Sequence, residues 1–267
     1  MSSIQANANP TMLADLIEGL RRHRLWRFIA QREIARQYKR TIIGVLWIPL
    51  HVLLHVLILG AVFTLVMDGG GRYFAYFALS YAIWKPFGQM LGLASNLWKS
   101  NDKYVKHLPG PISLYVIKAV YRVTLVLVMS LPVGIGLAYA TGAPAPGWPL
   151  LLVIPGVVLF VANMAWITTA LSVICLRFRD VRSLVPNMLF VIYLGTPIMW
   201  EPSKLGDHQW IAQVNPLYHL FSVIREPVLG AMPAWWSWAV ALGLAVVGNL
   251  VAWSLLGAVR RRIPLWL

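Results

Sequence analysis

Residues 42–67 read IIGVLWIPLHVLLHVLILGAVFTLVM and decide the fold class. The run is apolar and uncharged, and about 20 such residues suffice for a helix to cross the hydrocarbon core of a membrane. The 267-residue chain around it is 59% hydrophobic and 12% charged, against about 25% charged in an ordinary soluble domain. The sequence therefore predicts an all-α membrane protein and argues against a soluble enzyme. Pro49 is expected to kink this first span.

Five further apolar runs follow, so we expect six transmembrane helices. Their predicted ranges are 42–67, Tyr73–Trp98, Tyr115–Ala140, Trp148–Leu176, Leu184–Trp200 and Trp235–Val259. The fifth is short and contains Pro186 and Pro197, which favour a kinked or tilted helix. Glu201–Ala234 is too polar to cross simply, and its apolar part, Pro216–Leu229, is too short. A re-entrant or periplasmic helical hairpin between the fifth and sixth spans is therefore expected.

Basic residues indicate the orientation of the chain. Lys and Arg number 23 against 9 acidic residues, a net charge of +14. They cluster before the first span, between spans two and three, between four and five, and after the sixth. The opposite loops hold only Arg72, Lys204 and Arg225, beside acids that include Asp68. The positive-inside rule then places both termini in the cytoplasm, in a multi-pass inner-membrane protein. Because the basic clusters all fall on the cytoplasmic side, the topology accounts for the excess of Lys and Arg, and nucleic-acid binding is not needed to explain it.

Three segments follow from this topology: a cytoplasmic N-terminal segment (1–41), a transmembrane domain (42–260) and a cytoplasmic tail (261–267). Within the first, Thr11–Lys39 carries apolar residues at helical spacing beside an arginine-rich face. This pattern is typical of one or two amphipathic helices on the membrane surface. A plain positive flank is the alternative.

Several catalytic motifs are absent from the sequence. No Gly-Lys dipeptide occurs, so the chain has no P-loop of the G-x-x-x-x-G-K-[ST] type and would depend on a partner for ATP hydrolysis. No H-E-x-x-H or G-x-S-x-G motif occurs either, and no acid lies deep in a predicted span. His51 and His55 are four residues apart, but no third ligand is evident and Cys175 is the sole cysteine. We expect a transport subunit with no metal or cofactor of its own.

The second span contains the residues that we expect to line a channel. Lys85 is a charge in mid-span, where it either faces an anionic part of a substrate or is solvated through the pore or by backbone carbonyls. Tyr73, Phe77, Tyr81 and Trp84 are spaced four, four and three apart and therefore share a helix face. Such rings could stack on sugars, although packing in the core or at the lipid boundary is the more common use of membrane aromatics.

Two cytoplasmic turns are candidates for docking a soluble partner. The first, Lys99–Pro111, is rich in turn formers, and the second, Arg177–Arg182, is compact and charged. The candidate contact residues are Asn101, Asp102, Lys103, Lys106, Arg177, Arg179, Asp180 and Arg182. A solvated turn between helices is the alternative for each.

Four motifs then resemble one family. They are residues 32–47 (REIARQYKRTIIGVLW), residues 215–230 (NPLYHLFSVIREPVLG), Arg179-Asp-Val-Arg182 followed by Pro186, and Pro197-Ile-Met199. Their order and spacing resemble the permeases of ABC-2 type polysaccharide exporters, which serve O-antigen, capsule and teichoic acid export. The resemblance covers essentially the whole chain. One local departure is that Pro49 comes two residues after Trp47, where the family usually has a proline about five residues after it.

The resemblance implies a homodimer bound to two copies of a separate P-loop ATPase, which carries the ATP and Mg²⁺. It implies a lipid-linked polysaccharide as substrate, commonly on undecaprenyl diphosphate, with the two turns as coupling elements. Residues near the lipid diphosphate would be Arg24, Arg27, Arg32, Arg36, Lys39 and Arg40. Residues of an exit gate would be Asn215, Pro216, His219, Arg225 and Glu226. The alternatives are an ABC-2 exporter of a small lipid or drug, or a membrane enzyme acting on a lipid-linked sugar.

Overall fold

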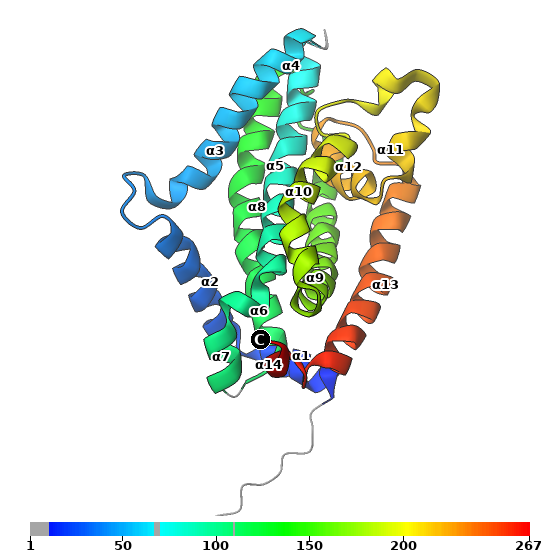
Figure 1. The fold of residues 1–267 in the computed structure, drawn as a ribbon. Coiled ribbons are helices and arrows are strands. Elements are labelled where there is room, and N and C mark those ends of the chain that lie inside the picture. The colour runs from blue at the N-terminus through cyan, green and yellow to red at the C-terminus, as the bar shows by residue number, and fades with distance from the viewer. Residues whose placement is uncertain (1–10, 67–69, 109) are drawn as a thin grey trace, which may run out of the picture.

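The computed structural model of the chain describes residues 11–66, 70–108 and 110–267. Met67 at the end of the predicted first span, Asp68 in the following loop and Pro109 in the first predicted turn lie outside the described residues. Within these ranges all regular structure is helical, as the sequence predicts, and no strand occurs. Figure 1 shows a bundle of long helices that carries short helices at both of its ends.

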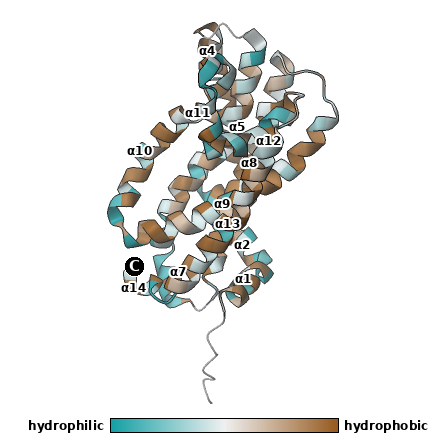
Figure 2. Cartoon of the chain, turned by 90° about the vertical axis from the view of Figure 1, so that its right-hand side faces the viewer, coloured by the Kyte–Doolittle hydropathy of each residue, from teal (hydrophilic) through white to brown (hydrophobic). Residues whose placement is uncertain are grey.

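Long helices form the body of the bundle. They are η1 (Gly44–Leu46) with α3 (Trp47–His55), η2 (Val56–Gly60) and α4 (Ala61–Val66), then α5 (Gly70–Ser95), α8 (Ser113–Thr141), η3 (Trp148–Leu152) with α9 (Val153–Arg177), α10 (Arg179–Gly195) and α13 (Trp235–Val259). Among the described residues, four helices are long and apolar enough to cross a membrane: Gly44–Val66, Ser113–Thr141, Trp148–Arg177 and Trp235–Val259. In Figure 2, α10 is hydrophobic over most of its length and hydrophilic at the end near α14.

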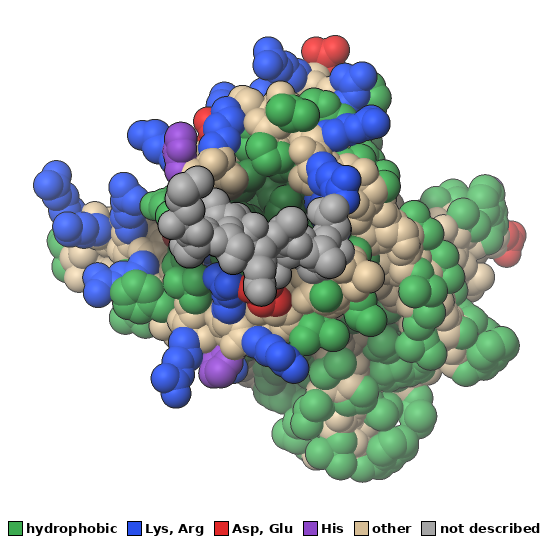
Figure 3. All heavy atoms as spheres, turned by 90° about the horizontal axis from the view of Figure 1, so that it is seen from below, with side chains coloured by type: hydrophobic (Ala, Val, Ile, Leu, Met, Phe, Trp, Pro, Cys, Tyr) green, Lys and Arg blue, Asp and Glu red, His purple; other side chains and the backbone are tan. Residues whose placement is uncertain are grey.

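Short helices lie at the two ends of the bundle. They are α1 (Met12–Arg21), α2 (His23–Gln37), α6 (Leu97–Ser100), α7 (Asp102–His107), η4 (Pro202–His208), α11 (Trp210–Val214), α12 (Pro216–Val228) and α14 (Ile263–Trp266). We call the end that holds α1, α7 and α14 the terminal end, and the opposite end, with α4 and α11, the far end (Figure 1). Lys and Arg side chains surround the terminal end (Figure 3).

The core is built around α5, most of whose residues are buried. Its main neighbour is α8, which lies beside it along most of its length. Gly134 of α8 permits this close approach, because a Cβ there would lie 2.6 Å from the Cβ of Ala82. At the far end the two helices meet through Gly71 and Gly142, where a Cβ on Gly71 would overlap the carbonyl oxygen of Thr141. Helices α5 and α8 therefore approach closely at both of these positions.

The irregular position in the first span differs from the predicted one. Pro49 lies in the first turn of α3, where a helix tolerates proline because the missing N–H has no partner in any case. The change in winding occurs further along, in the π-helical turn η2. Pro49 therefore does not interrupt α3, and a kink at this position stays a prediction.

The fifth helix ends at Gly195, five residues before the predicted end at Trp200. Thr196 precedes Pro197, and the residue before a proline is disfavoured in helical conformation, so Thr196 is extended. Side chains of α5 donate hydrogen bonds to the backbone carbonyl groups that follow Thr196. The hydroxyl of Tyr73 donates to Met199 O, and that of Tyr76 donates to Pro197 O at 2.8 Å. Backbone groups outside regular helices need such partners when they are buried away from water.

Both predicted cytoplasmic turns are more regular than expected. The first contains the end of α6 and all of α7, so it forms a short helical excursion and not an open loop. In the second, α10 begins at Arg179, which leaves Phe178 alone between α9 and α10.

The N-terminal segment forms two helices, and α1 is fixed to the start of α8. The carboxylate of Asp15 accepts hydrogen bonds from the backbone N–H groups of Ile112 (3.1 Å) and Ser113 (2.9 Å). It thereby satisfies donors that a helix N-terminus leaves free. On the opposite side, Leu13, Ile17 and Leu20 of α1 are exposed. An apolar face left open in this way is typical of a helix at a membrane interface.

Candidate functional site

Two adjoining cavities form one groove along α5. The cavity toward the terminal end has a volume of about 650 Å³, and its neighbour about 620 Å³. Both are lined by Gln37, Gly88, Gln89 and Leu189, which makes them continuous. We call this pair the substrate groove, after the role proposed for it below. Helices α2, α5 and α10 contribute walls to both of its parts.

Aromatic and basic side chains line the inner part of the groove. Tyr81 stacks on His55 with ring centroids 3.7 Å apart and planes 8° from parallel. Trp84 lies 5.3 Å from Tyr193 by ring centroids, and Lys85 lines the same cavity. Glycines at positions 88 and 92 of α5 also line the groove; a Cβ on Gly92 would meet nothing within 4 Å.

Some polar atoms at the groove lack partners. Within the described ranges, buried His55 Nε2 and the Tyr193 hydroxyl have no hydrogen bond. Lys85 likewise has no ion pair with any described residue. Buried polar groups without partners are unfavourable, because they lose hydration and gain no hydrogen bond in return. Of these three groups, only half-buried Lys85 is open to a ligand in the groove, where a hydroxyl or anionic oxygen could pair with it.

The part of the groove toward the terminal end holds a charged network that the sequence analysis missed. Glu33 of α2 accepts from Lys118 Nζ at 2.6 Å and from Arg122 Nη1 at 3.2 Å. Arg122 Nη2 also donates to Gln37 Oε1 at 2.8 Å, and Lys118 Nζ donates to Asn101 Oδ1 at 2.8 Å. The network joins α2, α8 and the residue between α6 and α7.

Lys85 is therefore not the only charge within a predicted span. Lys118 and Arg122 also lie within the predicted third span, Tyr115–Ala140. They are tolerated because Glu33 of α2 reaches them and compensates their charge. A signal for them was available, since two basic residues four apart near the start of an apolar helix share one face.

The predicted aromatic stripe divides into two parts. Tyr81 and Trp84, with Lys85, line the groove. Tyr73 and Phe77 are buried and do not line it. Tyr73 donates its hydroxyl to Met199 O, in the turn that follows α10, and the Phe77 ring packs 6.5 Å from that of His55. The helix face is shared as predicted, but neighbouring segments cover its half toward the far end.

The six predicted basic residues near the first span are all exposed. Arg36 lines the groove, whereas Arg27 stacks over Trp26 and Arg32 over Phe28. Arg40 has a left-handed φ of 74° in the turn that leads to α3. Arg24, Arg27, Arg32, Lys39 and Arg40 do not line the groove.

The predicted coupling residues lie on or beside α7 and at the corner between α9 and α10. Asp102 and Lys106 form an ion pair of 2.8 Å along α7. Arg177 stacks over Trp266 of α14, and α14 contacts both α7 and α9. Exposed charges complete these surfaces: Lys103, Arg179 and Asp180, with half-buried Arg182. The two segments are therefore bridged by the C-terminal residues.

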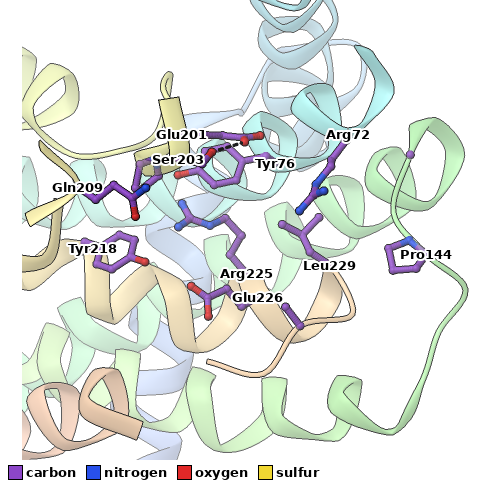
Figure 4. A pocket seen from close by; sticks show the side chains of 13 residues that line it. Arg72, Tyr76, Pro144, Glu201, Ser203, Gln209, Tyr218, Arg225, Glu226 and Leu229 are labelled. Carbon is purple, nitrogen blue, oxygen red and sulfur yellow. Dashed lines mark hydrogen bonds between the residues drawn. The ribbon is translucent and has the colours of Figure 1, made fainter. Parts of the chain in front are cut away.

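The predicted exit-gate residues all belong to α12 or its cap. Asn215 caps α12 by accepting from the N–H of Leu217 at 2.9 Å, and Pro216 occupies the first turn. The side-chain amide of Asn215 also donates to Gly195 O at 3.1 Å, which ties α12 to the end of α10. His219 hydrogen-bonds Ser237 Oγ at 2.9 Å. Arg225 and Glu226 border a separate cavity at the far end (Figure 4).

No metal site is formed by the described residues, because no three His, Cys, Asp or Glu side chains converge there. His51 and His55 lie 6.1 Å apart by ring centroids. His55 is instead part of the aromatic wall of the groove.

The geometry and the sequence together identify the class of protein. Residues 24–229 match the family model described as ABC-2 type transporter. The chain belongs to this family, and its apolar helices make it a multi-pass membrane protein.

Relatives within the family carry more particular names. The chain is 26% identical over 202 residues to the O-antigen export system permease protein RfbA of Myxococcus xanthus. The aligned region covers 73% of this chain and 76% of that relative. Two proteins of the same name from Klebsiella pneumoniae are each 24% identical over 205 residues, covering 74% of this chain and 77% of each relative.

Proposed function

We propose that the chain is the permease subunit of an ATP-driven exporter that moves a lipid-linked polysaccharide, of the O-antigen or capsular kind, across the cytoplasmic membrane. The observation that carries this proposal is the continuous substrate groove from Arg36 and Arg122 to Tyr81, Trp84 and Lys85. The names of the relatives point to the same class of substrate.

The chemistry of the groove suits the two parts of such a substrate. The exposed guanidinium of Arg36 can bind the oxygens of a lipid diphosphate in a bidentate fork. Arg122, whose terminal nitrogens already donate to Glu33 and Gln37, adds positive charge nearby. Tyr81 and Trp84 are 5% and 9% exposed, so they present ring edges at the wall of the groove, where sugar rings can pack on them. The sugar hydroxyl groups can then meet half-buried Lys85. Weak contacts of this kind let a polymer slide.

Six spans are proposed from the four apolar helices together with α5 and α10. Helix α5 has 26 residues, long enough to cross, and lies against α8. Helix α10 has 17, about 25 Å at 1.5 Å per residue, so it would reach across a locally thinned bilayer. The basic terminal end would face the cytoplasm, with residues 1–41 and 261–267 there, 42–260 in the membrane domain and α12 at the outer side.

A homodimer with two ATPase subunits is the proposed assembly. The groove is open, and the neighbouring surface of α10 exposes apolar side chains, among them Leu184, Phe190 and Val191. A second copy could cover that surface and enclose a channel. The α7 segment and the corner at Phe178 would rest on the ATPase, which would bind the ATP and Mg²⁺ because the chain has no P-loop of its own.

A pull-down in gentle detergent tests the assembly. The tagged chain is expected to bring down a P-loop ATPase in equal amount, and a strain that lacks the chain should lose its surface polysaccharide. Absence of any ATPase, with the surface polysaccharide intact, would exclude the proposal.

Trp84→Ala tests the groove. It should lower surface polysaccharide while leaving ATPase co-purification unchanged, since Trp84 is remote from α7. Trp236→Ala is the matched control, because that indole is exposed on α13 and does not line the groove. Equal export in both variants would contradict a role for the aromatic wall.

Orientation can be tested with single cysteines. Cys175 is buried, so Cys175→Ser gives a suitable background. A cysteine at Ser100 should react with an impermeant maleimide only in inverted vesicles, and one at Ser203 only in intact spheroplasts. The opposite pattern would reverse the proposed topology.

A further inference from the structure

A second cavity lies at the far end and shares no lining residue with the substrate groove. Its volume is about 620 Å³, within the usual range of small-ligand pockets. It lies between the start of α5, the loop after α8, the η4 region and α12. Side chains of opposite charge point into it, Arg72 and Arg225 against Glu201 and Glu226 (Figure 4).

Arg225 is the unusual member of this cavity. It is 1% exposed, yet it forms no ion pair with a described carboxylate. Its Nη1 donates to Ser80 Oγ and to Pro197 O, each at 3.0 Å, and its guanidinium lies 4.0 Å from the centre of the Tyr76 ring. Its buried Nε has no partner among the described residues. A buried guanidinium whose N–H group donates no hydrogen bond is unfavourable unless another group supplies an acceptor or a compensating charge.

The remaining walls offer acceptors and a flat surface. Glu226 accepts from Ser222 with one carboxyl oxygen, and Glu201 accepts from Ser203. The ring of Tyr218 lies beside them, 5.9 Å from the Arg225 guanidinium. Donors, acceptors and an aromatic ring around one small volume suit a neutral ligand that carries many hydroxyl groups. An anion would meet two carboxyl groups in addition to the two guanidinium groups, which makes it a poorer match.

We propose that this far-end cavity is a binding site for one neutral sugar residue of the exported glycan. The inference rests on the proposed function, which supplies the glycan and places this end outside. Arg225 would donate to sugar hydroxyls, Glu226 and Glu201 would accept from them, and the Tyr218 ring would pack on the sugar ring. Because Arg225 also holds the carbonyl of Pro197, the sugar would bind against the segment that follows α10.

Protection of a cysteine at the mouth of the cavity tests the site. In the Cys175→Ser background, the exposed residue Ser203 is replaced by cysteine, and its maleimide rate is measured in the purified permease–ATPase complex. The probe is the mixture of oligosaccharides released by mild acid from the source cell's own surface polysaccharide. The rate should fall about threefold when two-thirds of the sites are filled.

Ala231→Trp is the decisive second variant. Ala231 lines the cavity and is exposed, so an indole can fill the volume without disturbing the core. It should abolish the protection, and Arg225→Lys should weaken it. Asp207→Cys serves as the site control, because Asp207 is exposed in η4 and does not line the cavity. Neither the oligosaccharides nor Ala231→Trp should change its rate.

Each outcome decides a different claim. Absence of protection at position 203, or equal protection in the Ala231→Trp variant, would overturn the sugar site. If the deletion strain has meanwhile lost its surface polysaccharide, the proposed function stands without that site. Unchanged surface polysaccharide in the deletion strain would overturn both.

Discussion

Glu33 of α2 and Lys118 of α8 form an ion pair of 2.6 Å across 85 residues of sequence, and Lys118 is only 4% exposed. Lys118 also donates to Asn101, which immediately precedes α7, while Glu33 lines the substrate groove. If a bound ATPase displaced α7, the movement would therefore be transmitted through Asn101 and Lys118 to Glu33 at the wall of the groove. The pair is a physical link between the proposed coupling helix and the proposed substrate path.

Lys118→Met should destabilise the protein, because Glu33 would lose the more buried of its two basic partners. Loss of one partner from a buried pair costs about 3 kcal/mol, and this is the upper bound here because Glu33 keeps its ion pair with Arg122 and is partly exposed. Thermal unfolding in detergent measures the change. The double variant Glu33→Gln with Lys118→Met should lose less than the sum of the single changes, and strict additivity would show that the pair is not coupled.

Arg36→Gln should reduce export of the glycan by about tenfold, the effect of losing roughly 1.4 kcal/mol of binding at a charged contact. Arg36 is the predicted basic residue that lines the groove. Arg21→Gln is the matched control, since Arg21 is exposed on α1 and does not line it. Surface polysaccharide per cell is the readout, and a similar loss in both variants would indicate a general effect of charge.

Gly134→Ala should destabilise the α5–α8 pair by about 1–3 kcal/mol, because its Cβ would lie 2.6 Å from that of Ala82 and 3.1 Å from Ala78 O. Gly136→Ala, two residues along α8, would meet nothing within 4 Å. It should leave stability unchanged or raise it by up to about 1 kcal/mol through helix propensity. Thermal melts compare the two, and equal melting temperatures would contradict the close approach.

Asn215→Ala should lower stability by about 1 kcal/mol, since α12 would lose its N-cap. Asn215→Asp keeps the capping oxygen but removes the amide that donates to Gly195 O. It should therefore recover the cap while leaving α12 less firmly tied to α10. Hydrogen exchange of the first turn of α12 distinguishes the variants, and identical exchange in all three proteins would refute the capping role.

Stability should depend on pH through Glu226. Burial raises the pKa of this carboxyl above its ordinary value of 4.5, against the opposing effects of the Ser222 hydrogen bond, Arg225 and His219. The folded protein therefore holds the proton more tightly than the unfolded chain. The stability from this group is fully present below the ordinary pKa and is lost as the pH rises through the folded pKa.

Glu226→Gln removes that dependence, because glutamine stays neutral. The melting temperature of the variant relative to the parent should rise between acidic and neutral pH. Ser222→Ala should shift the loss of stability to higher pH, since it removes a hydrogen bond that lowers the pKa of Glu226. If the difference in melting temperature between Glu226→Gln and the parent did not change with pH, the raised pKa of Glu226 would be contradicted.

Apolar run length predicted the long helices well, because each must satisfy its own backbone in a membrane. The sixth predicted span, Trp235–Val259, coincides with α13. Helix ends were predicted less well where a distant segment supplies the hydrogen-bond donors for the backbone carbonyl groups. The end of α10 is set by Pro197 and by tyrosines about 120 residues earlier in the chain. The local sequence around Pro197 contains no pattern from which these donors could be predicted.

The candidate site was predicted only in part for the same reason. Helical spacing correctly placed Tyr81, Trp84 and Lys85 on or beside one face of α5, but it could not tell which part of that face is covered. Lys118 and Arg122 were not predicted, because the residue that compensates their charge, Glu33, lies on another helix far away in the sequence. The far-end cavity draws on distant segments, so sequence spacing does not reveal it.

The hydrogen bonds from Tyr73 and Tyr76 to residues 197–200 have a consequence for biosynthesis. The donors are synthesised long before the carbonyl groups that need them. If α5 and α10 are membrane spans, as proposed above, the last part of the α10 segment can enter the bilayer without penalty only after α5 has inserted in the correct orientation. Tyr73→Phe with Tyr76→Phe would then act first on assembly in the membrane, leaving a chain that is made in full and removed by quality-control proteases.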